Sequence, residues 1–170
     1  MHGMAYSPLV FAFKEIDKQM VRDEAHRRQA TNERFGLRGR NGGPEEGAKA
    51  LRAHMLGAAG ELAVADCLHL RQFLYQEKEA KRGSCDLPPN IDVKTRSAHW
   101  HDLICQLDEK PDKILVLVTM QNRLTLVHGW IESKRAMQEQ WRKDPAVGRP
   151  AYFVPKEILQ PLLLLKDAQM

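Results

Sequence analysis

Apolar and polar positions alternate in two different ways along this chain. Over residues 11–34 and 44–70, apolar side chains recur among charged ones at the spacing of a helix. Pro44 is followed by two glutamates, which is typical of a helix start because acidic side chains complement the positive end of the helix dipole. The pattern predicts two helices joined by a glycine- and arginine-rich linker near residues 36–44.

The second half of the chain has the shorter period of β-strands. Strand-like runs occupy residues 72–78, 90–97, 113–120 and 124–131. A surface helix is expected at 132–143, a short strand at 151–154, and a terminal helix that Pro155 opens and Pro161 breaks. The stretch 99–107 fits either a strand or a short helix.

This order of elements predicts an α/β fold with a mixed central β-sheet flanked by helices. Residues 1–43 would form an N-terminal helical extension with its flexible linker, and residues 44–170 the main domain. A chain of 170 residues is long enough to bury a substantial core.

Composition narrows the function only a little. The formal net charge of +4 and the pI of about 9.0 permit nucleic-acid binding without requiring it. Three scattered cysteines suit neither a disulfide framework nor a zinc site, which favours reduced thiols and a cytoplasmic protein. No apolar run approaches the roughly 20 residues that a membrane-spanning helix needs, so no membrane partner is expected.

The candidate chemistry lies in the stretch GSCDLPPNIDVKTRS, residues 83–97. Side chains alternate along a strand, so Asp92 and Lys94 share one face, roughly 6–7 Å apart. Asp86 precedes a pair of prolines, and a turn there would bring it back beside Asp92. Two carboxylates that meet near a lysine repel each other unless a cation lies between them, and hard oxygen ligands suit Mg²⁺ or Mn²⁺.

A third carboxylate comes from the second predicted helix. Glu61 follows Gly57 and Gly60 in the small-residue run GAAGELAVADCL. The small residues would let this helix approach the sheet closely, so that Glu61 reaches the same cation directly or through water.

These residues resemble the PD-(D/E)XK nuclease superfamily, which includes restriction enzymes, phage exonucleases and Holliday junction resolvases. GAAGE supplies the helix glutamate Glu61, SCD supplies Asp86, and DVK supplies Asp92 and Lys94. Cys85 stands where the family name has proline. The resemblance covers about residues 57–131 and implies a restriction-endonuclease-like core of a helix, a three-stranded meander, a helix and a strand.

The tripeptide alone is a weak signal, because the chain holds four (D/E)-x-K matches, at 79–81, 92–94, 108–110 and 132–134. The last has a literal Pro-Asp ahead of it, at 111–112. Only the match at 92–94 is flanked by β-branched residues within one strand, with a glycine-spaced helix glutamate upstream. The alternative is that Asp86 caps a turn and that Asp92 and Lys94 form a surface pair on an edge strand.

Several other residues are candidates for contacts to nucleic acid. Thr95 and Arg96 follow the tripeptide directly, and Arg38 and Arg40 lie in the linker, just after Arg27 and Arg28. For Arg96 a plain solvated charge, and for the linker a plain flexible connection, are equally open interpretations.

The polar residues after the tripeptide form a second, weaker group. His99 and His101 flank Trp100 and have no partner cluster that would complete a zinc site, so this stretch is better interpreted as a polar or substrate-facing turn. Gln106 is a further candidate for the same cleft.

The resemblance implies a metal-dependent nuclease that hydrolyses phosphodiester bonds, most often in double-stranded or branched DNA, as a homodimer. It implies that Glu61, Asp86, Asp92 and the carbonyl of Val93 hold Mg²⁺, for which Mn²⁺ can substitute, and that Lys94 positions the attacking water. The alternative is a catalytically silent nuclease fold that binds nucleic acid or a protein. A purely structural protein, which would bind no metal, is the third hypothesis.

Overall fold

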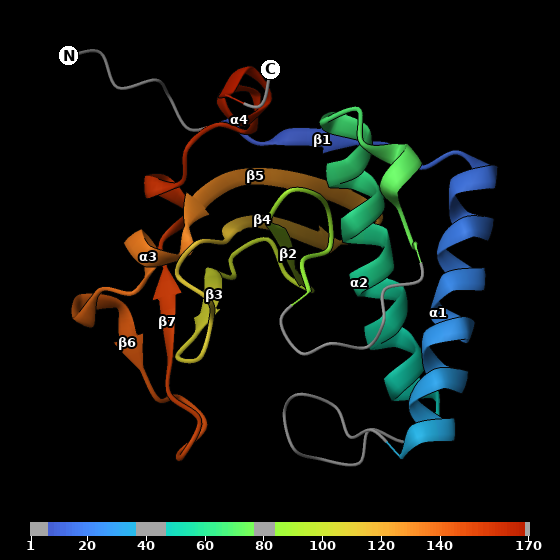
Figure 1. Ribbon diagram of the computed structural model, residues 1–170, viewed down its shortest axis with the longest axis horizontal. Helices are drawn as coiled ribbons and strands as arrows, with labels where there is room; N and C mark the ends of the chain where they lie inside the picture. Colours follow the sequence, from blue (N-terminus) through green and yellow to red (C-terminus); the bar gives the residue numbers. More distant parts are fainter. Residues whose placement is uncertain (1–6, 37–46, 77–83, 169–170) are drawn as a thin grey trace.

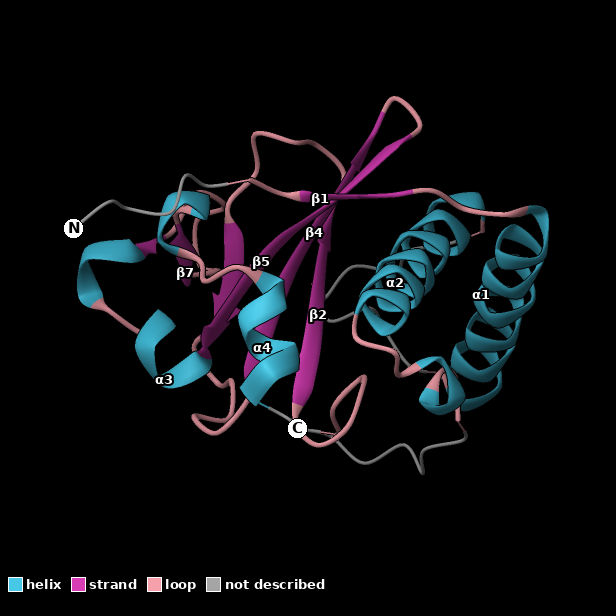
Figure 2. Ribbon diagram, turned by 90° about the horizontal axis from the view of Figure 1, so that it is seen from above, coloured by secondary structure: helices cyan, strands magenta, loops and turns pink. Residues whose placement is uncertain are grey.

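The computed structural model describes residues 7–36, 47–76 and 84–168. Helices α1 (Glu15–Phe35) and α2 (Ala48–Cys67) lie antiparallel and side by side, with α2 between α1 and the main sheet (Figures 1 and 2). A cluster around Val21, Ala58 and Leu62 fills the interface between the two helices. The long predicted helices are thus confirmed, although α1 begins at Glu15 and is preceded by a short strand, β1 (Leu9–Phe11), that the sequence pattern did not indicate.

The main sheet contains four strands in the order β1, β5 (Leu124–Glu132), β4 (Ile114–Gln121) and β2 (Ile91–Arg96). β2 pairs parallel with β4, whereas β5 pairs antiparallel with both β4 and β1. The predicted α/β fold with a mixed sheet and flanking helices is therefore confirmed. β4 is buried on both faces, which is why its sequence ILVLV is continuously apolar rather than alternating.

A smaller sheet lies across one face of the main one. It has the order β3 (Leu103–Gln106), β7 (Ala151–Val154) and β6 (Arg142–Lys143). Its Leu103 and Val154 pack with Leu115 and Leu117 of β4 in one core cluster. The other face of the main sheet is covered by α2 and by α4 (Leu162–Ala168), in a second cluster that contains Val64, Val116 and Leu165.

Some predicted elements are wrong. The expected strand at 72–78 is replaced in its described part by a 3-10 turn at Arg71–Phe73. The expected helix at 132–143 shrinks to α3 (Ser133–Ala136), then a 3-10 turn at Glu139–Trp141 and β6. Tertiary pairing with β7 draws these residues into an extended conformation that their helical propensity disfavours.

The structure also shows the secondary structure of residues 99–107 and of the C-terminal segment. The stretch 99–107 contains β3, and the terminal helix divides into a 3-10 turn at Lys156–Ile158 and α4 around Pro161. The linker and the boundary near residue 43 lie outside the described residues.

The connection between β2 and β4 departs from a simple meander. Because these strands are parallel, the chain crosses over between them and forms β3 of the other sheet on the way. The β4–β5 pair is an ordinary hairpin with a bulge, since the register shifts between Leu117 and Val118 so that His128 has no opposite residue.

Candidate functional site

Strand β2 directs its side chains to two different environments. Ile91 packs against α2 in the larger core cluster, whereas Asp92 and Lys94 turn toward the opposite face, where their side chains meet at 3.2 Å. The alternation expected from IDVKT is therefore present, and it buries the charged pair instead of exposing it to solvent.

Asp92 and Lys94 belong to a group of four charges that we call the charge quartet, completed by Glu109 and Lys113. Lys94 Nζ donates to Asp92 Oδ2 and, at 2.7 Å, to Glu109 Oε2. Lys113 Nζ lies 2.9 Å from Asp92 Oδ2 and 3.3 Å from Glu109 Oε1. None of the four side chains exposes more than 15% of its surface. Two carboxylates and two ammonium groups thus offset each other in a closed, charge-neutral ring.

The ring provides hydrogen bonds to only one of the two carboxylate oxygens of Asp92. Its Oδ2 receives both ammonium groups, but its buried Oδ1 has no hydrogen-bond partner among the described residues. A buried polar atom without a partner is unusual and costly. Oδ1 is therefore an acceptor that remains available to a cation or a donor.

Burial and neighbouring charges have opposite effects on the pKa values of Asp92 and Lys113. Burial raises the pKa of Asp92, but Lys94 and Lys113 outweigh it and hold that pKa below its ordinary value. Burial likewise lowers the pKa of Lys113, yet its contacts with Asp92 and Glu109 raise it overall. Both groups therefore stay charged at neutral pH.

Asp86 lies beside β2 through a tight turn. Leu87 and Ile91 form an isolated antiparallel bridge across the proline pair, and the Asp86 N–H donates to the Ile91 carbonyl at 2.8 Å. The turn thus folds Asp86 back onto the strand, as expected. Its Oδ2 accepts a hydrogen bond from the Val93 N–H at 2.7 Å, so the carboxylate secures the backbone of the tripeptide between Asp92 and Lys94.

Glu61 lies on the part of α2 that comes closest to β2. A Cβ built on the preceding residue, Gly60, would lie 1.8 Å from Thr95 Oγ1, so only glycine permits this approach. The Glu61 carboxylate does not point to the quartet. It receives two hydrogen bonds from Arg28 of α1, at 2.9 and 2.6 Å, and Arg28 also contacts the buried Glu24.

The expected convergence of Glu61, Asp86 and Asp92 is not seen, because each carboxylate has a separate partner: Arg28, the Val93 N–H and the two lysines. Within the ranges that the structure describes, no three histidine, cysteine or acidic side chains are close enough to hold a metal ion. Asp92 Oδ1 fits one ligand of a divalent cation. A full ligand set would need Glu61 or Asp86 to exchange its partner.

The flanking candidates have mixed environments. Thr95 packs against Gly60, and its Oγ1 makes no hydrogen bond within the described chain. Arg96 is partly buried, and burial lowers its pKa despite the opposing charge of Asp102. One of its terminal nitrogens is buried and has no partner in the described part of the chain. Arg38 and Arg40 lie outside the described residues.

The histidine–tryptophan stretch forms a turn. Nδ1 of His99 lies 2.7 Å from Thr119 Oγ1, while Trp100 is 75% exposed and available for stacking. Gln106 ends β3, in the smaller sheet. The stretch is thus a polar turn, in which Trp100 is exposed and both histidines are partly buried.

Three residues of this region were missed or misinterpreted from the sequence. Glu109 was considered only as part of the rival match at 108–110, Lys113 only as the start of the predicted strand at 113–120, and Arg28 only as a neighbour of possible contacts to nucleic acid. The four-residue separation of Glu109 and Lys113 gave no usable signal, because it brings side chains together only in a helix and residues 107–113 contain no helix. Their burial could not be inferred from that spacing.

Comparison of the chain with protein-family models, with curated proteins and with solved structures finds no match. Among the helices that the structure describes, none combines the length and the apolar character needed to cross a membrane.

Proposed function

We propose that this protein is a metal-dependent nuclease of the PD-(D/E)XK type, with a restriction-endonuclease-like core, that hydrolyses phosphodiester bonds in DNA. The observation that carries the proposal is the buried Asp92 carboxylate, which lies beside Lys94 on one face of β2 and has one oxygen with no partner among the residues described. A carboxylate and an amine held together in a strand are the pair that this chemistry needs.

Each residue of the site has its own role in this proposal. Asp92 would hold Mg²⁺, or Mn²⁺ in its place, and Asp86, the Val93 carbonyl and Glu61 would be the further ligands, which requires Glu61 to leave Arg28. When bound, the divalent cation lowers the pKa of a water molecule and offsets charge on the phosphate. Lys94 orients the water and stabilises the negative charge that develops on the phosphate oxygens. Asp86, by binding the Val93 N–H, fixes the strand that presents both groups.

The substrate and assembly follow from the same proposal. The net charge of +4 suits a polyanion, and Thr95, Arg96, Arg38 and Arg40 are the proposed contacts to the DNA backbone. A homodimer would supply two such sites to the strands of a duplex or a branched junction. DNA as substrate and cysteines that form no disulfide among the described residues both favour a cytoplasmic protein.

Cleavage assays test the proposal. Wild-type protein is incubated with Mg²⁺ or Mn²⁺ and with supercoiled, linear, single-stranded and branched DNA. We expect cleavage of at least one substrate, its loss in Asp92→Asn and Lys94→Met, and heat from Mn²⁺ binding in calorimetry that disappears in Asp92→Asn.

The rival tripeptide at 132–134 provides matched controls, because Glu132 and Lys134 are exposed. Glu132→Gln and Lys134→Met make the same chemical changes and should retain cleavage. The nuclease proposal fails if the folded wild type leaves all four DNA forms intact with both metals.

The second candidate is a catalytically silent nuclease fold that binds nucleic acid or a protein. It is favoured by the partners of the two key carboxylates, since Arg28 holds Glu61 and two lysines hold Asp92. This candidate predicts no Mn²⁺ heat and no cleavage. DNA binding measured in EDTA, unchanged in Asp92→Asn, would then support it.

A further inference from the structure

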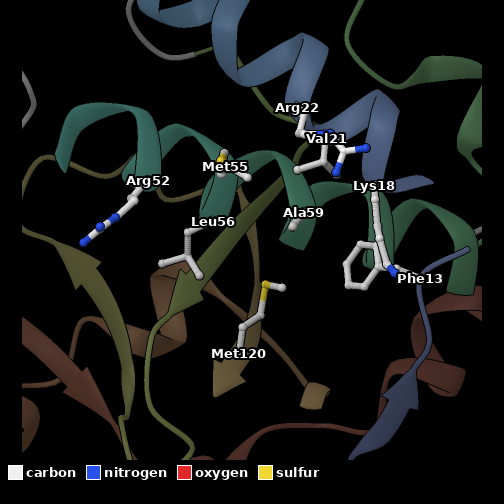
Figure 3. A pocket seen from close by; sticks show the side chains of 9 residues that line it. All are labelled: Phe13, Lys18, Val21, Arg22, Arg52, Met55, Leu56, Ala59 and Met120. Atoms are coloured by element: carbon white, nitrogen blue, oxygen red, sulfur yellow. The ribbon is translucent and has the colours of Figure 1, made fainter. Parts of the chain in front are cut away.

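An apolar cavity of about 430 Å³ opens between α1 and α2 and reaches Met120 of β4 (Figure 3). Its floor is almost entirely hydrophobic, with two flexible methionines from different elements, Met55 of α2 and Met120 of β4. The other apolar lining residues are Phe13, Val21, Leu56 and Ala59. We call this cavity the methionine groove.

The charged residues that line the methionine groove are all basic. Lys18 and Arg22 of α1 lie toward one end and Arg52 of α2 toward the other, and none of the described residues that line the cavity is acidic (Figure 3). Lys18 contacts Glu15 outside the cavity and Arg22 contacts Gln19, whereas Arg52 has no polar partner within the described chain. The groove therefore combines an apolar floor with a positive rim.

The groove continues into a second hollow of about 780 Å³ along β1 and the β4–β5 hairpin. The two share Phe13, Lys18 and Met120. The second hollow adds a fourth cation, Arg123 at the hairpin tip, and again no acidic lining residue. The two hollows together involve residues of β1, α1, α2 and the β4–β5 hairpin, which offers a chain segment more contacts than a compact metabolite needs.

We propose that the methionine groove binds an acidic, amphipathic peptide segment of a partner protein. Methionine-rich grooves between helices accommodate apolar side chains that project at intervals of three to four residues. The cations at both ends pair with acidic residues that flank these anchors. A nucleic-acid base would find few polar partners on this floor, because only the charged tips and the hairpin supply them.

The proposal is tested by fluorescence anisotropy with a labelled helical peptide of about 14 residues that carries leucines on one face and glutamates on the others. Binding should weaken as salt is raised from about 50 to 500 mM. Arg22→Glu with Arg52→Glu should weaken it about tenfold or more. Met55→Gln, which keeps the charges, should weaken it as well. Circular dichroism verifies that each variant is folded.

Matched controls distinguish peptide binding in the methionine groove from attraction to the overall positive charge of the protein. The exposed pair Arg135→Glu and Arg149→Glu changes the net charge equally and should leave peptide binding unchanged. A peptide with glutamine in place of leucine should not bind. The proposal is overturned if the acidic peptide does not bind, if the control pair weakens it as much as the groove pair does, or if oligo(dT) or decanoate occupies the groove and the peptide does not displace it. Because these readouts need neither metal nor cleavage, they are independent of the nuclease proposal.

Discussion

Lys113 Nζ lies 2.9 Å from Asp92 Oδ2. Lys113 directly precedes β4, so this contact connects β4 to the charged face of β2. The two residues are 21 positions apart, and their side chains are 7% and 8% exposed. Lys94 and Lys113 both donate to Oδ2, so Oδ1 is the Asp92 oxygen without a partner among the described residues. Lys113 is therefore in a position to serve as the built-in cation of the site.

Replacing Lys113 tests this role. Lys113→Met leaves Asp92 and Glu109 with a single ammonium group, so we expect the free energy of unfolding to fall by about 3–5 kcal/mol in urea denaturation. Adding Glu109→Gln should restore part of the loss, because one negative charge then faces one positive charge. If Asp92 is a metal ligand, Mn²⁺ should bind more tightly to the double variant than to wild type. Unchanged stability of Lys113→Met would contradict the burial of the quartet.

The link between Arg28 and Glu61 makes a parallel prediction. Arg28→Met leaves the carboxylates of Glu61 and Glu24, 10% and 5% exposed, without their shared guanidinium. We expect a loss of about 3–5 kcal/mol, partly recovered by Glu61→Gln. Arg27→Met is the control: its side chain is 48% exposed and also contacts Glu24, so about 0–1 kcal/mol is expected. Equal losses in the two arginine variants would refute the assignment.

Gly60 and Gly57 should respond oppositely to alanine. In Gly60→Ala the new methyl group collides with Thr95, so the variant should be less stable by about 1–3 kcal/mol. In Gly57→Ala the nearest neighbour is Arg28 Nη1 at 3.6 Å, an ordinary contact, so the helix should gain about 0.5–1 kcal/mol. Adding Thr95→Ala to Gly60→Ala should recover much of the loss. Thermal unfolding of the four proteins measures these effects, and stabilisation by Gly60→Ala would show that α2 does not approach β2 so closely.

His128 predicts a pH dependence of stability. Burial, with a smaller effect from Lys156, lowers its pKa from 6.5 to about 4. The folded state thus keeps His128 neutral while the unfolded state takes up a proton. The free energy of unfolding is therefore unaffected by the protonation of His128 above pH 6.5. It falls by up to about 3 kcal/mol as the pH is lowered toward 4.

Denaturant unfolding at pH 7 and pH 4.5 measures the effect. His128→Asn should lose less stability across this interval than wild type, whereas His26→Asn, at an exposed position of α1, should follow wild type. The interpretation fails if the wild type and His128→Asn lose equal stability between the two pH values.

The sequence by itself determined the local features of this protein. The 3.6-residue and two-residue periods located α1, α2, β2, β4 and β5, because these periods follow from backbone geometry. The alternation in IDVKT placed Asp92 and Lys94 on one face of β2, and the proline pair predicted the turn that returns Asp86 to that strand. Gly60 also indicated a close helix–strand approach, although not its partner Thr95.

Only the tertiary structure decided which charges meet. Glu109 was only part of a rival tripeptide and Lys113 only the start of a predicted strand, but the crossover from β2 to β4 buries Glu109 against Lys94 and Lys113 against Asp92. Glu61 was expected to face the sheet, but it faces Arg28, because α1 packs along the outer side of α2. Residues 139–143 prefer a helix locally, yet pairing with β7 makes part of them a strand. In each case the deciding interaction joins residues far apart in the sequence, and local patterns carry no information about such pairs.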